Sequence, residues 1–130
     1  MNGKIRVLVV DDSLTMQKAL GMVFAREDDM TVIGYAASGE EAEHMIDRLR
    51  PEVVTIDIGL PGLDGLSLLD HLRNGRCRSR SVVLSSTVTA ANDAIGRGAY
   101  GFFDKRRVLS DAGELVALVR HAAGGYRLAS

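Results

Sequence analysis

The sequence predicts a single α/β domain in which a parallel β-sheet is covered by helices on both faces. Its 130 residues suit one domain of ordinary size. Short apolar segments alternate along the chain with segments in which apolar residues recur at helical spacing. The apolar segments are nearly uninterrupted, which is typical of strands buried on both faces. Because crossover connections between parallel strands are right-handed, a doubly wound sheet is the simplest arrangement.

Five strands are expected, because five short segments are rich in β-branched and other apolar residues and lie between turn-forming residues. These segments are 5–10, 31–36, 53–56, 81–85 and 99–103. In a doubly wound sheet, ligands bind outside the carboxyl ends of the strands. A functional site is therefore expected where these segments end.

The first helix follows the first strand. Its apolar stripe has the spacing i, i+3, i+4, i+7 and i+8 and consists of Met16, Ala19, Leu20, Val23 and Phe24. Either Asp12 or Ser13 can cap its first turn. The polar turn at 26–29 closes it.

The second helix opens at Ser38, whose hydroxyl can form a capping box with Glu41. Its apolar stripe consists of Ala42, Met45, Ile46 and Leu49. Pro51 cannot continue a helix and disfavours helical geometry at Arg50, so the helix is expected to stop there.

Three more helices follow the third, fourth and fifth strands. The third carries Leu68, Leu69 and Leu72, and the last carries Leu115, Leu118, Val119 and Ala122. The fourth spans about 89–97, is rich in alanine and ends among glycines, so it is expected to be the weakest helix.

The composition argues against several classes of function. The net charge is −1, so the chain lacks the basic surface expected of a nucleic-acid-binding domain. Its longest apolar runs are only a few residues, so no membrane span or membrane partner is expected, and the expected location is the cytoplasm. The single cysteine excludes an internal disulfide.

Polar and charged side chains end four of the five predicted strands. They are Asp11 and Asp12, Asp57, Ser85 and Ser86, and Asp104 and Lys105. Each residue alone has an ordinary structural explanation as a helix cap, a turn former or an exposed base. Together they converge on one edge of the sheet with complementary chemistry, which favours a functional site.

Three carboxylates at this edge predict a cation site. Carboxylates within about 5 Å repel by about 3 kcal/mol per pair at an effective dielectric constant near 20. An all-oxygen set suits Mg²⁺, particularly where a phosphate completes the coordination. An aspartate can attack a phosphoryl group and become an acyl phosphate, while a metal, an ammonium and a hydroxyl stabilise the transferred oxygens. Asp57, at the end of a buried strand before a Gly/Pro turn, is the rigidly presented candidate nucleophile.

Over residues 4–124 the chain resembles the receiver domains of bacterial two-component response regulators. The resemblance lies in four motifs that occur in the family's order and near its spacing. They are VLVVDDS at 7–13, DIGLPGLDG at 57–65, VVLSS at 82–86 and GAYGFFDK at 98–105. The resemblance implies a flavodoxin-like (βα)5 fold with a five-stranded parallel sheet in the order 2-1-3-4-5.

The resemblance also implies a role for each site residue. Asp57 would be the phosphoacceptor, and Mg²⁺ or Mn²⁺ would be held by Asp11, Asp12, Asp57 and the backbone carbonyl of Gly59. Ser85, or alternatively Ser86, would bind the phosphoryl oxygen as the switch hydroxyl. Lys105 would pair with the phosphoryl group, and Phe102 occupies the aromatic switch position.

The implied function is a phosphorylation-activated signalling switch rather than an enzyme that turns over a free substrate. The donor would be a sensor histidine kinase or a histidine phosphotransfer protein, and a receiver homodimer is a further candidate partner. The segment 115–130 resembles receivers of LuxR/NarL-type transcription regulators, so 125–130 is either a tail or the start of a linker. DNA would be bound only through an output domain outside this chain. A stand-alone messenger or phosphorelay receiver is the alternative.

Two departures from the family pattern carry expectations. Arg106 follows Lys105 where many members have a cis proline, so a trans peptide bond and a differently shaped loop are expected. The interval 85–98 is about two residues shorter than is usual, which would trim the fourth helix or its entry.

Three rival classes fit the sequence less well. A haloacid-dehalogenase-like phosphohydrolase needs D-x-D-x-T after its first strand, whereas DDSLT at 11–15 places the acids side by side. A flavodoxin needs a phosphate loop rich in Ser, Thr and Gly, which 11–17 is not. A degenerate receiver is disfavoured by the complete set of acids, hydroxyl and lysine.

Overall fold

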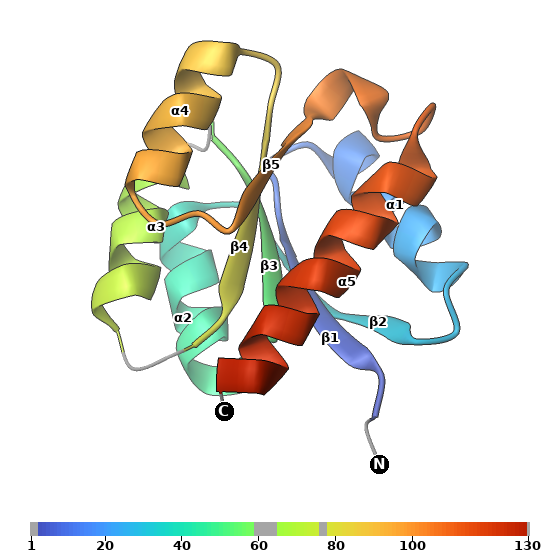
Figure 1. The fold of residues 1–130 in the computed structure, drawn as a ribbon, viewed down its shortest axis with the longest axis horizontal. Helices are drawn as coiled ribbons and strands as arrows, with labels where there is room; N and C mark the ends of the chain where they lie inside the picture. Colours follow the sequence, from blue (N-terminus) through green and yellow to red (C-terminus); the bar gives the residue numbers. More distant parts are fainter. Residues whose placement is uncertain (1–2, 59–64, 76–77, 130) are drawn as a thin grey trace.

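Five parallel strands form one sheet in the order β2-β1-β3-β4-β5, which confirms the predicted fold class and strand order (Figure 1). The computed structural model describes residues 3–58, 65–75 and 78–129. The strands are β1 (Ile5–Val10), β2 (Met30–Ala36), β3 (Val53–Asp57), β4 (Arg80–Ser85) and β5 (Gly101–Asp104). The helices are α1 (Leu14–Ala25), α2 (Gly39–Leu49), α3 (Gly65–Asn74), α4 (Val88–Gly96) and α5 (Ala112–Ala129), with a short 3₁₀ helix η1 (Lys105–Arg107).

Helices cover both faces of the sheet, as predicted. Helices α1 and α5 lie on one face, and α2, α3 and α4 lie on the other (Figure 1). Successive strand residues alternate between the two cores: Val7 and Val9 pack with α1 and α5, whereas Leu8 and Val10 pack with α2 and α3. This alternation is the two-residue period of a strand, and it explains why the strands are apolar throughout.

The last strand begins later than its apolar pattern predicts. The predicted segment was 99–103, but β5 spans Gly101–Asp104 and pairs with β4 from Val82↔Gly101 to Ser85↔Asp104. Tyr100 still donates its backbone N–H to Ser81, at 2.9 Å, ahead of the ladder. The shift extends the strand to Asp104, directly before Lys105.

Of the two candidate caps of α1, the structure shows Ser13 rather than Asp12. The Ser13 hydroxyl accepts a hydrogen bond from the Met16 N–H at 3.2 Å, whereas Asp12 lies outside the helix with an exposed side chain. Asp12 is therefore not used as a cap.

The predicted capping box of α2 forms only in half. Ser38 accepts from the Glu41 N–H at 3.2 Å, but the Glu41 carboxylate accepts from the N–H of Ala37, at 2.7 Å, instead of the N–H of Ser38. The reciprocal bond is displaced by one residue, from Ser38 to Ala37.

The α2 helix ends at Leu49, before Pro51, as predicted. Arg50 adopts left-handed geometry with φ 49°, which is common at helix C-termini. The guanidinium of Arg6 donates to the carbonyls of Leu49 (2.8 Å) and Arg50 (2.6 Å). A side chain from β1 thereby satisfies carbonyls that the helix leaves without partners.

The two C-terminal helices differ in length. Helix α4 has nine residues and is capped by Thr87, whose hydroxyl accepts from the Ala90 N–H at 3.3 Å. Helix α5 has 18 residues and continues through 125–129, where Arg80 donates to the Gly125 carbonyl at 3.3 Å. No helix among the described residues has the length and apolar character needed to cross a bilayer.

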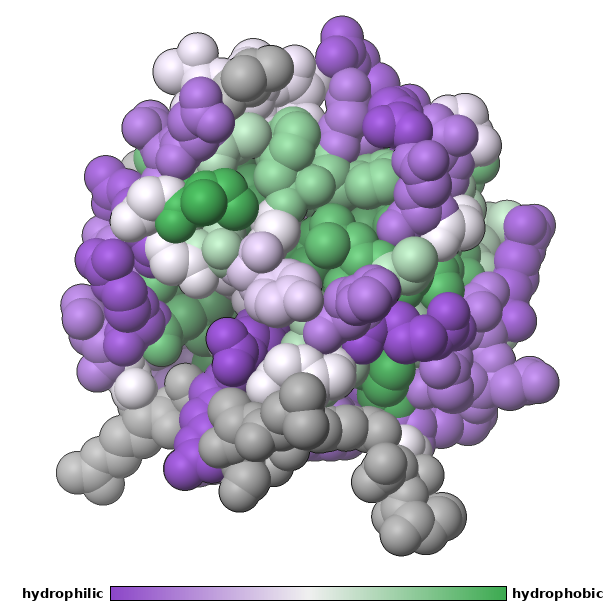
Figure 2. Space-filling view, viewed as in Figure 1, coloured by the Kyte–Doolittle hydropathy of each residue, from purple (hydrophilic) through white to green (hydrophobic). Residues whose placement is uncertain are grey.

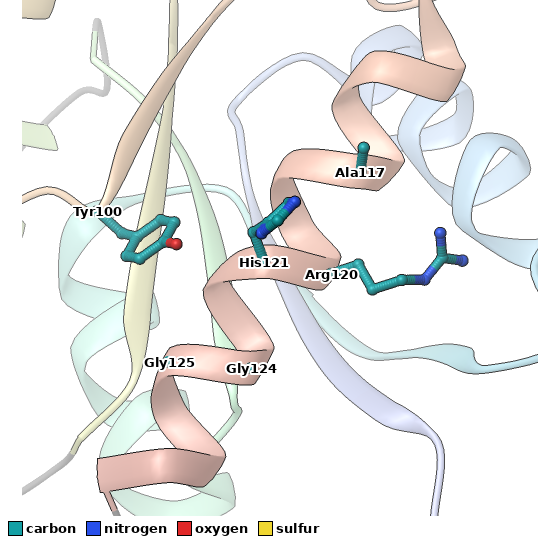
Figure 3. Close-up of a pocket in the computed structure, with 6 residues that line it drawn as sticks. All are labelled: Tyr100, Ala117, Arg120, His121, Gly124 and Gly125. Carbon is teal, nitrogen blue, oxygen red and sulfur yellow. The ribbon is translucent and has the colours of Figure 1, made fainter.

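The face seen in Figure 2 is mainly polar, with apolar residues gathered across its middle, over the region between α4 and α5. A hollow of about 590 Å³ lies lower on α5 and is lined by Tyr100, Ala117, Arg120, His121, Gly124 and Gly125 (Figure 3). Arg120 is paired there with Glu27 and Asp29. Because Tyr100 precedes β5, this hollow lies toward the amino ends of the strands, away from the predicted site.

Candidate functional site

The acidic side chains lie at the carboxyl ends of β1 and β3, which are neighbours in the sheet. Val10 pairs with Ile56, so the next residues, Asp11 and Asp57, leave adjacent strands at the same level. Asp11 is fully buried and Asp57 is 7% exposed, whereas Asp12 is exposed. One oxygen from each of the three carboxylates lies within 4.8 Å of the others.

Lys105 joins this cluster from the end of β5. Its Nζ lies 3.0 Å from Asp57 Oδ2 and 3.5 Å from Asp11 Oδ2. The ammonium therefore bridges the two buried carboxylates and partly offsets their repulsion. The structure thus brings the adjacent Asp11 and Asp12 together with Asp57 and Lys105, which lie far away along the chain, and each of the four was singled out by the sequence.

The environment shifts the protonation of two of these groups. Burial raises the pKa of the Asp11 carboxyl, and the nearby Asp57 carboxylate adds to the rise, although the Ser13 N–H and Lys105 oppose it. Burial acts to lower the pKa of Lys105, but its hydrogen bond to Asp57 and the charges of both carboxylates outweigh burial and raise it. Lys105 is therefore a fixed cation at neutral pH.

The chain leaves β3 through a tight contact that holds Asp57 in place. A Cβ on Gly65, the first residue of α3, would lie 2.7 Å from the Asp57 carbonyl oxygen and 2.9 Å from the Ile58 Cα. Only glycine allows this approach between backbones, so α3 packs directly against the end of β3. Gly59, the predicted carbonyl ligand, lies outside the described residues.

The two serines that end β4 have different surroundings. Ser85 is 7% exposed, and its Oγ accepts the Thr87 N–H at 3.1 Å, whereas Ser86 is exposed. Ser85 lies two residues after Val83, which pairs with Phe102 of β5. The side chains of Ser85 and Phe102 therefore project from the same face of the sheet, the one covered by α4.

The loop after Lys105 contains residues whose contacts the sequence pattern did not reveal. The peptide bond between Lys105 and Arg106 is trans, as predicted. The turn is η1, capped by Asp104, which accepts from the Arg106 N–H at 2.9 Å. The only signal in the sequence was the acid and the base on either side of Lys105. Thr87, the partner of Ser85, was also missed.

The cluster fits a divalent cation on two observations. Its three carboxylate oxygens are close enough to share one ion. Asp11 Oδ2 is buried without a hydrogen-bond partner among the described residues, although Lys105 is 3.5 Å away. Buried polar atoms are rarely left without a partner, and an oxygen-only donor set suits Mg²⁺.

Mg²⁺ is expected to raise the melting temperature of the protein. A ligand that binds only the folded state stabilises that state by about 2.7 kcal/mol when the ligand concentration is one hundred times the dissociation constant. The variant Asp11→Asn should gain much less from Mg²⁺, because one carboxylate ligand is lost. Thermal melting with and without Mg²⁺ measures both effects, with Asp93→Asn on the exposed face of α4 as the control.

The same variant should melt at a higher temperature than wild type when Mg²⁺ is absent. A carboxyl whose pKa is raised by folding stabilises the fold while protonated, and this contribution is lost as the pH rises. Ionised Asp11 therefore costs stability at neutral pH, and asparagine keeps the acceptor for the Ser13 N–H. The difference in melting temperature between Asp11→Asn and wild type should shrink as the pH falls toward about 4. A lower melting temperature for metal-free Asp11→Asn at neutral pH would contradict this.

The fold and the cluster together define a doubly wound α/β protein with an acidic cation site and a lysine at the carboxyl edge of its sheet. The family model of the response regulator receiver domain matches residues 7–120 of this chain. The chain belongs to this family. Receiver domains generally bind Mg²⁺ at an acidic pocket, interact with histidine kinases and phosphotransfer proteins, and are not themselves enzymes of free substrates.

The curated relatives of this chain include proteins with different names. A protein-glutamate methylesterase/protein-glutamine glutaminase of Myxococcus xanthus is 39% identical over 129 residues, covering 92% of this chain and 37% of the relative. The transcriptional regulatory protein YvfU of Bacillus subtilis is 34% identical over 128 residues, covering 97% of this chain and 62% of the relative. The chain thus spans less than two thirds of the length of both relatives.

Solved structures show the same fold. The response regulator domain of Thermotoga maritima CheB has a TM-score of 0.84 and 32% identity, covering 93% of this chain and 97% of that chain. The NarL receiver domain of Mycobacterium tuberculosis has a TM-score of 0.88 and 27% identity, covering 95% and 99%. A CheX–CheY–BeF3–Mg²⁺ complex from Borrelia burgdorferi has a TM-score of 0.72 and 27% identity, covering 86% and 89%.

Proposed function

We propose that this receiver is a phosphorylation-activated switch and that Asp57 accepts the phosphoryl group. The observation that carries the proposal is the position of Asp57, held at the strand edge 3.0 Å from the Lys105 ammonium and beside Asp11 and Asp12. The donor is a phosphohistidine of a sensor kinase or a phosphotransfer protein. A carboxylate oxygen of Asp57 attacks phosphorus, the bond from phosphorus to the imidazole nitrogen breaks, and an acyl phosphate forms.

Each neighbour of Asp57 has a role in the proposal. Asp11 and Asp12, with the Gly59 carbonyl, hold a Mg²⁺ or Mn²⁺ ion, which neutralises charge on the transferred oxygens when bound. Lys105 pairs with one of these oxygens, for which its fixed positive charge suits it. Ser85, rather than the exposed Ser86, donates its hydroxyl to another after leaving Thr87. Phe102, on the same face of the sheet, fills the space that Ser85 vacates.

The phosphoryl group adds about two negative charges at this edge. Such a charge shifts an existing equilibrium between two arrangements of the chain. The nine-residue helix α4 is the proposed moving element, because Thr87, which caps it, is also the partner of Ser85. Drawing Ser85 toward the phosphate would release that contact and change the surface formed by α4, β5 and α5.

We propose that the output lies in a domain outside this chain, with residues 125–130 leading toward it. The relatives support two outputs: YvfU favours regulation of transcription, and the methylesterase relatives favour a regulated catalytic domain. A receiver that acts alone as a messenger remains the alternative. The native coding sequence beyond residue 130 distinguishes all three, because a DNA-binding domain, a catalytic domain or a stop codon would follow.

Incubation with a small acyl-phosphate or phosphoramidate donor tests the switch. Intact-protein mass spectrometry should find one added phosphoryl group per chain, only when Mg²⁺ or Mn²⁺ is present. Hydroxylamine should remove it, because it cleaves acyl phosphates. A phosphoryl group that forms with chelator present, or that withstands hydroxylamine, would show that the chemistry is different.

A further inference from the structure

Asp104 and Arg106 form a clamp across Lys105, the residue between them. The Asp104 carboxylate accepts three hydrogen bonds from Arg106: from the backbone N–H at 2.9 Å, from Nε at 3.1 Å and from Nη2 at 2.9 Å. The two side-chain bonds form the planar fork with which a guanidinium binds a carboxylate. The Arg106 contacts lower the pKa of Asp104, so the carboxylate is ionised at neutral pH.

The clamp acts on the backbone from which Lys105 reaches the site. Asp104 ends β5 and caps η1, and Lys105 is the first residue of η1. The Lys105 side chain must span from this turn to Asp57 Oδ2 and Asp11 Oδ2. A lysine has four rotatable bonds and no fixed shape, so the position of its ammonium depends on how firmly its backbone is held.

Arg106 makes contacts with Asp104 that a proline at this position could not make. Proline has no N–H and could not donate the 2.9 Å bond to Asp104. Proline also has no guanidinium with which to make the two side-chain bonds to Asp104. The loop of this chain is therefore held by a side-chain clamp at the position where the resemblance implies that many family members have proline.

The other contacts of the loop do not reach Asp104. Arg107 pairs with Asp111 and Glu114 and lies over the ring of Phe103, with 5.6 Å to its centroid. These contacts join η1 to Asp111, to the first turn of α5 and to β5. Within the part of the chain that the structure describes, the three bonds of Asp104 are thus specific to Arg106.

We propose that Arg106 is a positioning residue for phosphoryl transfer, which acts through Asp104 to hold the Lys105 ammonium over Asp57. This inference rests on the proposed function of Asp57 and Lys105. Arg106 is largely exposed, and exposed ion pairs are weak. The clamp therefore raises the fraction of molecules in which the Lys105 ammonium lies over Asp57 by only a few fold. Replacing Arg106 by alanine should slow phosphorylation by about fivefold.

The test measures the phosphorylation rate at saturating Mg²⁺, with the donor both well below saturation and at saturation, for Arg106→Ala, Arg106→Lys, Asp104→Ala and the double variant Asp104→Ala with Arg106→Ala. Arg106→Ala and Arg106→Lys should be slowed to a similar degree, because both lose the two side-chain bonds of the fork and keep the backbone bond to Asp104. Asp104→Ala loses all three bonds and should be slowed at least as much, and the double variant should be no slower than Asp104→Ala. The Mg²⁺ affinity and the melting temperature should change little. Arg107→Ala is the control for loss of a nearby positive charge.

A simple electrostatic attraction of the anionic donor gives a different pattern, which is seen only below saturation with donor. Arg106→Lys would then react at the wild-type rate, Asp104→Ala would react faster than wild type, and the double variant would fall between. That pattern, or an unchanged rate for Arg106→Ala, would overturn the proposal.

A second measurement separates this inference from the proposed function. The NMR signal of the Lys105 ammonium, protected by its hydrogen bond to Asp57, should shift or broaden in Arg106→Ala without any phosphoryl donor. If wild type is not phosphorylated but this signal changes, the proposed function fails and the clamp stands. If the signal is the same in both proteins, Arg106 does not position Lys105.

Discussion

Replacing Asp57 by asparagine is expected to abolish phosphorylation of this chain. The carboxamide has the size of the carboxylate, so the packing of Gly65 against the end of β3 is preserved. It lacks the negative oxygen that attacks phosphorus, and a neutral amide is a poor nucleophile. Asp11 is buried and ionises less readily, while Asp12 is exposed and belongs to the cation site, so neither is expected to replace Asp57.

The measurement is the fraction of chains that gain a phosphoryl group from a small donor with Mg²⁺, determined by intact mass. Asp57→Asn should show none under conditions that convert most of the wild type. Asp93→Asn, which removes an exposed carboxylate from α4, should react as wild type does. Equal labelling of Asp57→Asn and wild type would refute the assignment of Asp57, whereas labelling at another residue would redirect it.

The sequence predicted the site because parallel topology makes strand ends coincide. Once five apolar segments alternate with helical stripes, residues that end the first, third and fifth strands must lie along one edge. Asp11, Asp57 and Lys105 meet there, with Lys105 Nζ 3.0 Å from Asp57 Oδ2. Convergence of this kind follows from connectivity alone and needs no detail of any side chain.

The details that the sequence did not predict depend on local backbone geometry. The N–H groups at the start of a helix are offered to whichever neighbouring oxygen the dihedral angles bring close. Ser13 rather than Asp12 caps α1, and Glu41 bonds to Ala37 rather than Ser38, for this reason. Both alternatives have the correct residue types, so composition could not choose between them.

The clamp of Asp104 and Arg106 could not be predicted from the sequence, for a related reason. Residues i and i+2 of an extended strand lie on the same face but do not normally share three hydrogen bonds. They meet here because the chain turns into η1 at Lys105, and the apolar pattern placed the end of the last strand one residue too early. An error of one residue in a strand end was enough to hide the contact.

Replacing Lys105 by methionine is expected to slow phosphorylation by about 100-fold or more at saturating Mg²⁺. Removing one preorganised charged group from the oxygens that gain charge in a transfer reaction typically has an effect of this size. Methionine keeps the length and the apolar stem of the side chain. Lys18→Met, on the exposed surface of α1, is the matched control and should react at the wild-type rate. A rate within a few fold of wild type would show that the ammonium does not act on the transferred group.

The same variant should separate the structural role of Lys105 from its role in the reaction. A lysine whose pKa is raised by folding stabilises the fold below its unfolded pKa, and this contribution is lost as the pH rises through the folded pKa. At neutral pH and without Mg²⁺, Lys105→Met leaves the buried Asp11 and Asp57 without their cation, so its melting temperature should fall. A divalent ion can replace the lost positive charge, so Mg²⁺ should narrow the gap in melting temperature. The difference in phosphorylation rate between Lys105→Met and wild type should persist, because one ion cannot occupy both the metal position and the ammonium position around the phosphoryl group. If Mg²⁺ removes both the difference in melting temperature and the difference in rate, Lys105 contributes to stability alone.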